Sequence, residues 1–293
     1  MDLVPTVLSV VAPVFLLAAV GFVWVKAGLE YRVEFVTRLA MTMSVPCLIF
    51  VALMKTVVAP AAIGIIAVAS AVVYLVLTAV FWAAVRLAGL DRRTYLAPLI
   101  FGNTGNLGLP LALFAFGQEG LGLVVVVFAV MAVMSFTFGI WMVAGGGSPF
   151  RVLKEPMVGA TLLGALFLWR GWHTPEWITN TLQLAGQMAI PLMLITLGVA
   201  VARLHPRGVV QATVLNVLKA ALCTAAARGI GRWFALPDPA FAVLVLQVAT
   251  PVAVTSYLIA EKYRADAESV AGLVVMSTLF SVLTLPLTLA FLL

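Results

Sequence analysis

Residues 102–110 read Gly-Asn-Thr-Gly-Asn-Leu-Gly-Leu-Pro and lie inside an apolar run that covers 95–116. Three glycines, two asparagines and a proline within so short a stretch oppose a regular helix, so we expect it to be unwound. Unwound backbone at membrane depth is tolerated only where protein packs against it or where it lines an aqueous cavity. We therefore interpret this stretch as the strongest local indication of a binding site.

The composition places the rest of the chain in a membrane as well. Of its 293 residues, 64% are hydrophobic and 10% are charged, whereas soluble domains carry about 25% charged residues. Apolar runs of about 20 residues, the length that crosses a hydrocarbon core of about 30 Å, recur along the chain. We predict an all-α membrane protein with ten spans, near 4–25, 37–54, 60–85, 95–116, 121–143, 156–172, 180–201, 208–229, 239–260 and 268–292.

Lysine and arginine residues sort to one side of these expected spans. The loops after odd-numbered spans hold 12 of the 17 basic residues, and the opposite loops hold four. Because cytoplasmic loops retain positive charge, this bias predicts a multi-pass protein of the cytoplasmic (inner) membrane with both termini on the outer side. The basic residues form no stripe along one face, so we expect no nucleic-acid partner.

The two halves of the chain resemble each other. Residues 39–46 (LAMTMSVP) match residues 184–191 (LAGQMAIP) with Met and Pro in register, and Pro110 corresponds to Pro251. A repeat of five spans is odd in number, so the second copy must enter the membrane from the opposite side. The expected organisation is a first five-helix repeat over 1–144, a short cytoplasmic linker over 145–155 and an inverted second repeat over 156–293.

Residues 247–255 in the ninth span are also polar around a proline, and we expect this helix to break like the fourth. Four half-helix ends would then meet near the bilayer centre, where their N-terminal ends attract anions and their free carbonyls attract a cation or water. The alternative is a simple proline kink in each helix, with Asn and Gln side chains joining neighbouring helices. The candidate substrate-site residues at this crossing are Asn103, Thr104, Asn106, Gly108, Pro110, Gln247, Thr250, Pro251 and Thr255.

Lys219 is the one ionisable residue that falls well inside an expected span. A charge at the bilayer centre costs about 2.5–3.5 kcal/mol on insertion scales, so such a residue marks function. Three roles remain open: a counter-charge to the carbonyl ends at the crossing, a direct contact for an anionic substrate, or a titrating proton carrier. The alternative is a lysine whose head extends along the helix to a membrane interface.

The remaining polar residues exclude other kinds of site. No Asp or Glu lies mid-span, so a bound sodium ion would depend on neutral oxygens. No acid pair, metal-ligand set or nucleophile with a base occurs in the spans, so we expect no enzyme activity, no catalytic residue, no metal and no cofactor. Six residues of the second and seventh spans either line a substrate-facing cavity or serve helix packing, and the sequence favours neither interpretation. They are Met43, Ser44, Pro46, Gln187, Met188 and Pro191.

Several of these motifs resemble the auxin efflux carrier family, including its bacterial members. The resemblance depends on residues 103–111 (NTGNLGLPL), 191–194 (PLML) and 251–253 (PVA). It implies ten helices, a scaffold domain of spans 1, 2, 6 and 7, and a transport domain of spans 3, 4, 5, 8, 9 and 10. It also implies elevator-type alternating access, with spans 4 and 9 crossing at their prolines. Asn103, Pro110 and Pro251 fall on motif positions that carriers of this family use at the crossing. Bacterial members are associated with malate, malonate and other carboxylates.

These observations together predict a secondary active transporter that moves a small organic anion, a carboxylate, across the membrane by alternating access. Coupling to protons and driving by the membrane potential both remain open. The alternatives are a channel-like passive facilitator and a sodium-coupled symporter on the same fold. The expected partners are the anion, the lipid bilayer and a second copy of the chain in a homodimer.

Overall fold

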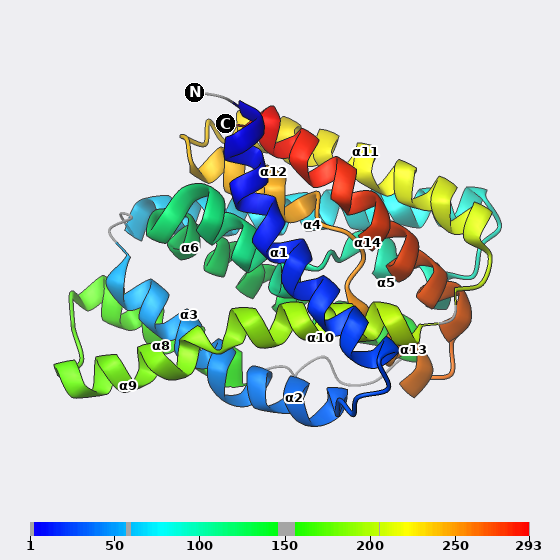
Figure 1. The fold of residues 1–293 in the computed structure, drawn as a ribbon. Coiled ribbons are helices and arrows are strands. Elements are labelled where there is room, and N and C mark those ends of the chain that lie inside the picture. The colour runs from blue at the N-terminus through cyan, green and yellow to red at the C-terminus, as the bar shows by residue number, and fades with distance from the viewer. Residues whose placement is uncertain (1–2, 57–59, 146–155, 205, 293) are drawn as a thin grey trace.

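The computed structural model describes residues 3–56, 60–145, 156–204 and 206–292, and within these ranges every regular element is a helix (Figure 1). The elements of the first half are α1 (Leu3–Lys26), α2 (Val33–Leu39), η1 (Ala40–Ser44), α3 (Val45–Lys55), α4 (Pro60–Leu87), α5 (Arg92–Ile100), η2 (Thr104–Gly108), α6 (Leu109–Met134), η3 (Ser135–Gly139) and α7 (Ile140–Ala144). Those of the second half are α8 (Pro156–Arg170), α9 (Glu176–Gln187), α10 (Ala189–Arg203), α11 (Val209–Trp233), α12 (Ala240–Val248), α13 (Val254–Lys262) and α14 (Ala267–Ala290). Most of the predicted linker, 146–155, lies outside the described residues.

Seven helical runs of the described chain are long and apolar enough to cross a membrane, which confirms a multi-pass all-α membrane protein. They are Val7–Lys26, Val33–Lys55, Ala61–Leu87, Thr104–Ala144, Glu176–Arg203, Val209–Trp233 and Ala267–Ala290. The 41 residues of Thr104–Ala144 would form a rod of about 60 Å, roughly twice a hydrocarbon core. Gly117 interrupts that run with a φ of 62° and a ψ of −150°, so it consists of two shorter helices.

Two of the long runs are irregular directly before a proline. The π-helix η1 ends two residues before Pro46, and the turn at Met188 between α9 and α10 lies three residues before Pro191. Proline lacks an N–H and its ring clashes with the carbonyl four residues earlier, so the regular helix cannot continue through that turn. The irregularities therefore fall at matching positions of the two halves.

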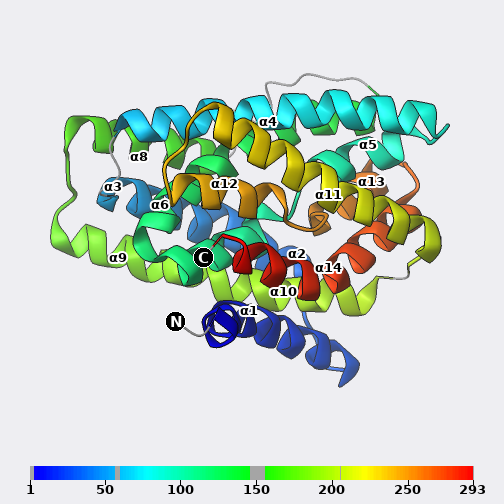
Figure 2. The ribbon, with the colours of Figure 1, turned by 90° about the horizontal axis from the view of Figure 1, so that it is seen from above.

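Helices α1 and α10 pack against each other through glycines, and both views show α1 lying along the outside of the bundle (Figures 1 and 2). A methyl group on Gly198 of α10 would overlap the carbonyl of Ala18, and one on Gly21 of α1 would overlap the carbonyl of Ile195. Small residues on both sides let the two backbones touch, which is a common mode of helix association in membranes.

The loops that follow α1, α4, α10 and α13 gather at one end of the bundle. Three contacts join them in pairs: the Arg93 side chain donates to the Tyr263 carbonyl at 2.8 Å, the Arg203 side chain donates to the Tyr31 carbonyl at 2.7 Å, and the Arg207 N–H donates to the Glu268 carbonyl at 3.4 Å. These loops hold many of the basic residues that the sequence assigns to one side of the membrane.

Candidate functional site

The fourth predicted span is interrupted, over a shorter stretch than expected. Helix α5 ends at Ile100, residues 101–103 are not helical, and the π-helix η2 then leads directly into α6. The expectation that all of 102–110 is unwound is therefore wrong. Pro110 is the second residue of α6, directly after η2, so the irregular hydrogen bonding of the π-helix falls in the turn that the proline ring disrupts.

The ninth predicted span breaks as well, between α12 and α13. Residues 249–253 separate the two helices, and Pro251 lies in the middle of this gap. The hydroxyl of Thr250 donates to the carbonyl of Gln247 at 2.6 Å and so satisfies a carbonyl near the end of α12. Both spans are thus interrupted, so the simple proline kinks of the alternative are wrong. Its other part, a Gln side chain that joins neighbouring helices, is found at Gln247.

The two interrupted segments cross each other through their main chains. Gly102 and Val252 form an isolated antiparallel bridge, and the N–H of Asn103 donates to the carbonyl of Pro251 at 2.7 Å. A methyl group on Gly102 would overlap the hydroxyl of Thr250, so this approach requires glycine. The crossing therefore pairs Pro251 with Gly102 and Asn103, whereas Pro110 lies beyond it in α6.

A second contact joins the halves next to the crossing. The Gln247 amide donates from Nε2 to the carbonyl of Gly108 at 2.8 Å, and both residues are buried. A methyl group on Gly108 would overlap this amide. Gly108 therefore serves close packing between η2 and α12.

Lys219 lies on α11 with 2% of its surface exposed, and its ammonium donates to the carbonyl of Leu99 at 3.0 Å. In a regular helix the Leu99 carbonyl would accept from the N–H of Asn103, four residues on, but that N–H donates to Pro251 instead. The ammonium thus binds a carbonyl that the interruption leaves without its helical partner. A cation at the C-terminal end of a helix also interacts favourably with the helix dipole.

The charge of Lys219 is not balanced by a carboxylate within the described part of the chain. The ion pairs found there are exposed and join Arg32 with Glu30, Arg38 with Glu34, and Arg207 with Glu268. The head of Lys219 reaches neither membrane interface, because it is bound inside the protein at Leu99. The alternative, in which the head of the lysine extends along its helix to a membrane interface, is therefore wrong.

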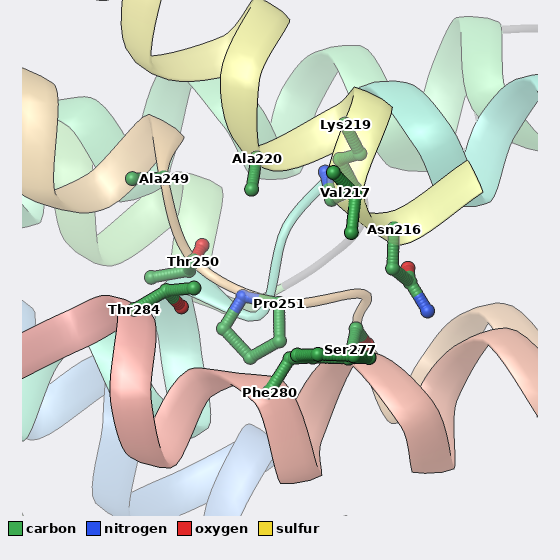
Figure 3. Close-up of a pocket in the computed structure, with 10 residues that line it drawn as sticks. All are labelled: Asn216, Val217, Lys219, Ala220, Ala249, Thr250, Pro251, Ser277, Phe280 and Thr284. Atoms are coloured by element: carbon green, nitrogen blue, oxygen red, sulfur yellow. The ribbon is translucent and has the colours of Figure 1, made fainter. Parts of the chain in front are cut away.

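A small cavity lies between Lys219 and the broken segment of α12–α13 (Figure 3). Lys219 and Asn216 of α11 face it on one side, Pro251 lies across from them, and Ser277 and Thr284 come from α14 (Figure 3). Its volume of about 40 Å³ is room for a few water molecules. Sites for organic ligands are typically about 300–1,000 Å³, so the cavity is too small for an organic ligand in this conformation.

Three polar members of this cavity, Asn216, Ser277 and Thr284, were not among the predicted site residues. Asn216 is 4% exposed and donates to the Leu273 carbonyl at 3.1 Å, and the hydroxyl of Ser277 accepts from the N–H of Val252 at 3.0 Å. The signal for Asn216 was its spacing of three residues from Lys219, which places both on one helix face. Ser277 carries no comparable signal, because its role depends on the position of the broken segment.

Buried polar atoms without a hydrogen-bond partner are frequent around the crossing. Within the described residues they include Nδ2 of Asn103, the hydroxyl of Thr104, Oδ1 of Asn216 and Oε1 of Gln247. Leaving such an atom unpaired costs about 1–3 kcal/mol, so native structures seldom leave several close together. These atoms are donors and acceptors that no described group satisfies in this conformation.

A family model described as membrane transport protein matches residues 6–154 and 147–289 of the chain. The chain belongs to the auxin efflux carrier family. It is therefore a member of a family of membrane transporters, and the resemblance drawn from its motifs is confirmed.

Two archaeal members of the family are similar over part of their length. The chain is 31% identical over 193 residues to an uncharacterized transporter of Methanothermobacter thermautotrophicus, with 63% of each chain covered. It is 26% identical over 204 residues to an uncharacterized transporter of Methanocaldococcus jannaschii, with 64% of each chain covered. The matched part of the chain thus spans less than two thirds of these curated relatives.

The other predicted crossing residues of this carrier lie near the break. The N–H of Asn106 donates to Oδ1 of Asn103 at 3.3 Å, so the Asn103 side chain caps the start of η2. Thr255 lies half-buried in the first turn of α13. Both remain predicted substrate-site residues.

The six predicted cavity residues of the second and seventh spans lie elsewhere in the carrier. None of them lines the cavity between Lys219 and Pro251. The four exposed ones are Met43, Gln187, Met188 and Pro191. Pro46 is half-buried, and Ser44 is fully buried. Their contact with a substrate stays a prediction, and the structure joins their helices where Gly186 packs against the main chain of Leu48.

Proposed function

We propose that this carrier is a secondary active transporter of small organic anions, with carboxylates as the substrate class. The observation that carries the proposal is the Lys219 ammonium, buried beside the crossing with no carboxylate partner among the described residues. An uncompensated buried charge is costly, and a carboxylate bound near it would lower that cost.

The electrostatics of the crossing favour an anion over sodium. The N-terminal ends of α13 and of the continuous η2–α6 helix carry partial positive charge and lie next to the crossing. A sodium ion held by neutral oxygens about 4 Å from the ammonium would be repelled by about 4 kcal/mol at an effective dielectric constant of 20. The same interaction stabilises a carboxylate, so sodium-coupled symport through this cavity is the weaker alternative.

Transport requires the crossing to open, because the cavity beside it holds only a few water molecules. The proposed mechanism is alternating access of the elevator type. Spans 3, 4, 5, 8, 9 and 10 carry the crossing and move against a scaffold of spans 1, 2, 6 and 7. The glycine-mediated contact of α1 with α10 and the packing of α3 against α9 at Gly186 support a scaffold that moves as a unit.

The proposed topology has ten crossings in two inverted repeats, 1–144 and 156–293. Gly117 divides Thr104–Ala144, so its first part completes the fourth crossing together with α5 and its second part is the fifth. The 15-residue α8 and the broken α12–α13 each supply one more. The matching interruptions of spans 4 and 9 support this arrangement. The gathering of basic loops at one end supports a cytoplasmic face there, with both termini on the outer side of the inner membrane. A homodimer is part of the same proposal.

Counterflow in proteoliposomes tests the proposed function. Vesicles loaded with an unlabelled dicarboxylate should accumulate the labelled compound transiently if the protein is a carrier that exchanges substrate. A channel-like facilitator would equilibrate the label without this overshoot. The same uptake measured with sodium replaced by choline should be unchanged, and a loss of uptake would favour the sodium symporter. If no member of a carboxylate panel overshoots, while an amine or a neutral solute does, the anion assignment is wrong.

A further inference from the structure

A second cavity lies at the end of the α4–α5 hairpin, and it shares no lining residue with the cavity at the crossing. It has a volume of about 400 Å³ and is bordered by α4, α5, η3 and α7. Figure 2 shows this hairpin at one end of the bundle, with α4 along the outer edge and α5 on the inner side of α4. Its wall combines three aromatic side chains with two arginines: Trp82, Phe138, Trp141, Arg92 and Arg93.

No carboxylate among the described residues forms an ion pair with either arginine. Arg93 is held by main-chain carbonyls, with Nε donating to Val143 at 2.9 Å and a terminal nitrogen to Tyr263 at 2.8 Å. Arg92 is exposed and forms no ion pair with any residue that the structure describes. The adjacent acid, Asp91, uses its oxygens to cap the start of α5.

The aromatic side chains make the other part of the cavity apolar. Phe138 and Trp141 stack with their ring centroids 5.7 Å apart, and Trp82 lies 41% exposed. The guanidinium of Arg86 lies 5.3 Å from the Trp82 ring centroid, which adds a third cation at the rim. Tryptophan beside arginine is typical of the level where lipid headgroups meet acyl chains.

We propose that this cavity binds an anionic phospholipid, with the headgroup phosphate at Arg92 and Arg93 and the glycerol and upper acyl chain against the aromatic wall. The position fits, because the hairpin follows the apolar helix α4 and its arginines lie at a membrane interface in the proposed topology. The volume accepts a glycerophosphate group and leaves the acyl tails in the bilayer. A zwitterionic headgroup brings its own cation to the arginines and is disfavoured.

Native mass spectrometry of the full-length protein in detergent tests this proposal with phosphatidylglycerol and phosphatidylcholine as probes. Wild type should bind one phosphatidylglycerol several-fold more tightly than phosphatidylcholine. Arg92→Gln should weaken phosphatidylglycerol binding on the order of fivefold, the contribution expected of one basic residue near the lipid surface. Arg38→Gln is the matched control, since Arg38 is also exposed but lies on α2 in an ion pair with Glu34, and it should leave binding unchanged.

Two further arms identify the source of the phosphate. Trp141→Leu should weaken lipid binding, whereas millimolar inorganic phosphate should fail to displace the lipid from wild type. Displacement by phosphate would show a free-phosphate site and overturn the lipid assignment. Equal affinity for the two lipids, or equal losses in Arg92→Gln and Arg38→Gln, would overturn it as well. Thermal unfolding of each variant checks that it is folded, and counterflow activity, which the crossing determines, is measured separately.

Discussion

Replacing Lys219 by methionine separates its structural role from its role in binding an anion. The substitution removes the hydrogen bond to the Leu99 carbonyl, and bonds of this charged type contribute about 1.5–3 kcal/mol. It also removes a buried charge whose insertion costs about 2.5–3.5 kcal/mol. The two effects oppose each other, so we expect the free energy of unfolding to change by no more than about 1 kcal/mol, or roughly 2–4 °C in the melting temperature.

Anion binding should respond far more strongly than stability. At an effective dielectric constant of 20, an ammonium attracts a carboxylate by about 4 kcal/mol at 4 Å and by about 2 kcal/mol at 8 Å. Since each 1.4 kcal/mol is a tenfold change, Lys219→Met should weaken binding by about thirtyfold to a thousandfold. Lys219→Gln keeps a hydrogen-bond donor but not the charge, and it should lose a similar factor.

Thermal shift with the best carboxylate from the counterflow panel measures this loss. At a concentration about 100 times the wild-type Kd, the ligand should stabilise the wild-type protein by about 2.7 kcal/mol. A thirtyfold weaker variant should be stabilised by less than about 1 kcal/mol at the same concentration. If either variant keeps the full wild-type shift and the full counterflow overshoot, the ammonium does not contact the anion and the reasoning fails.

Three other predictions concern packing and pH. Gly198→Ala forces a methyl group onto the main chain of α1 and should destabilise the protein by about 1–3 kcal/mol, while Gly64→Ala, with nothing within 4 Å, should be neutral; equal melting temperatures would contradict this. Gly108→Ala presses on the glutamine amide at the crossing and should reduce counterflow, with Gly64→Ala again unaffected. The hydrogen bond from the Ser269 hydroxyl lowers the pKa of Asp266 in the folded protein. The stability that ionised Asp266 contributes is therefore fully present above pH 3.8 and is lost as the pH falls through the lowered pKa of the folded state. Asp266→Asn keeps the cap but should remove this part of the acid dependence of the melting temperature.

Much of the crossing is predictable from the types of residue that form it. Glycine at 102 and proline at 251 interrupt a helix by their own chemistry, and both breaks are found where these residues lie. Pro110 misled the expectation because η2 leads into α6 without a break, and the irregular hydrogen bonding of this π-helix accommodates the proline ring.

The partner of Lys219 could not be predicted, because it depends on a contact between residues 120 positions apart. The sequence shows a mid-span lysine, but which group it meets depends on how α11 lies against α5. Ser277 is a similar case, since its hydroxyl binds an N–H that is free only because the ninth span is broken. Such contacts follow from the assembled crossing and leave no local pattern.

The crossing can be understood as an exchange of hydrogen bonds that begins with one interruption. When residues 101–103 leave the helix, the Asn103 N–H turns to the Pro251 carbonyl, and the Leu99 carbonyl accepts from Lys219 instead. An ammonium has three N–H donors, and of these one is used at Leu99 and one approaches the Cys223 sulfur at 3.9 Å. At least one donor therefore remains for a carboxylate, so an anion can bind without breaking the bond that holds α11 to α5. The same lysine can thus stabilise the interrupted helix and attract the substrate, because the two tasks use different hydrogens.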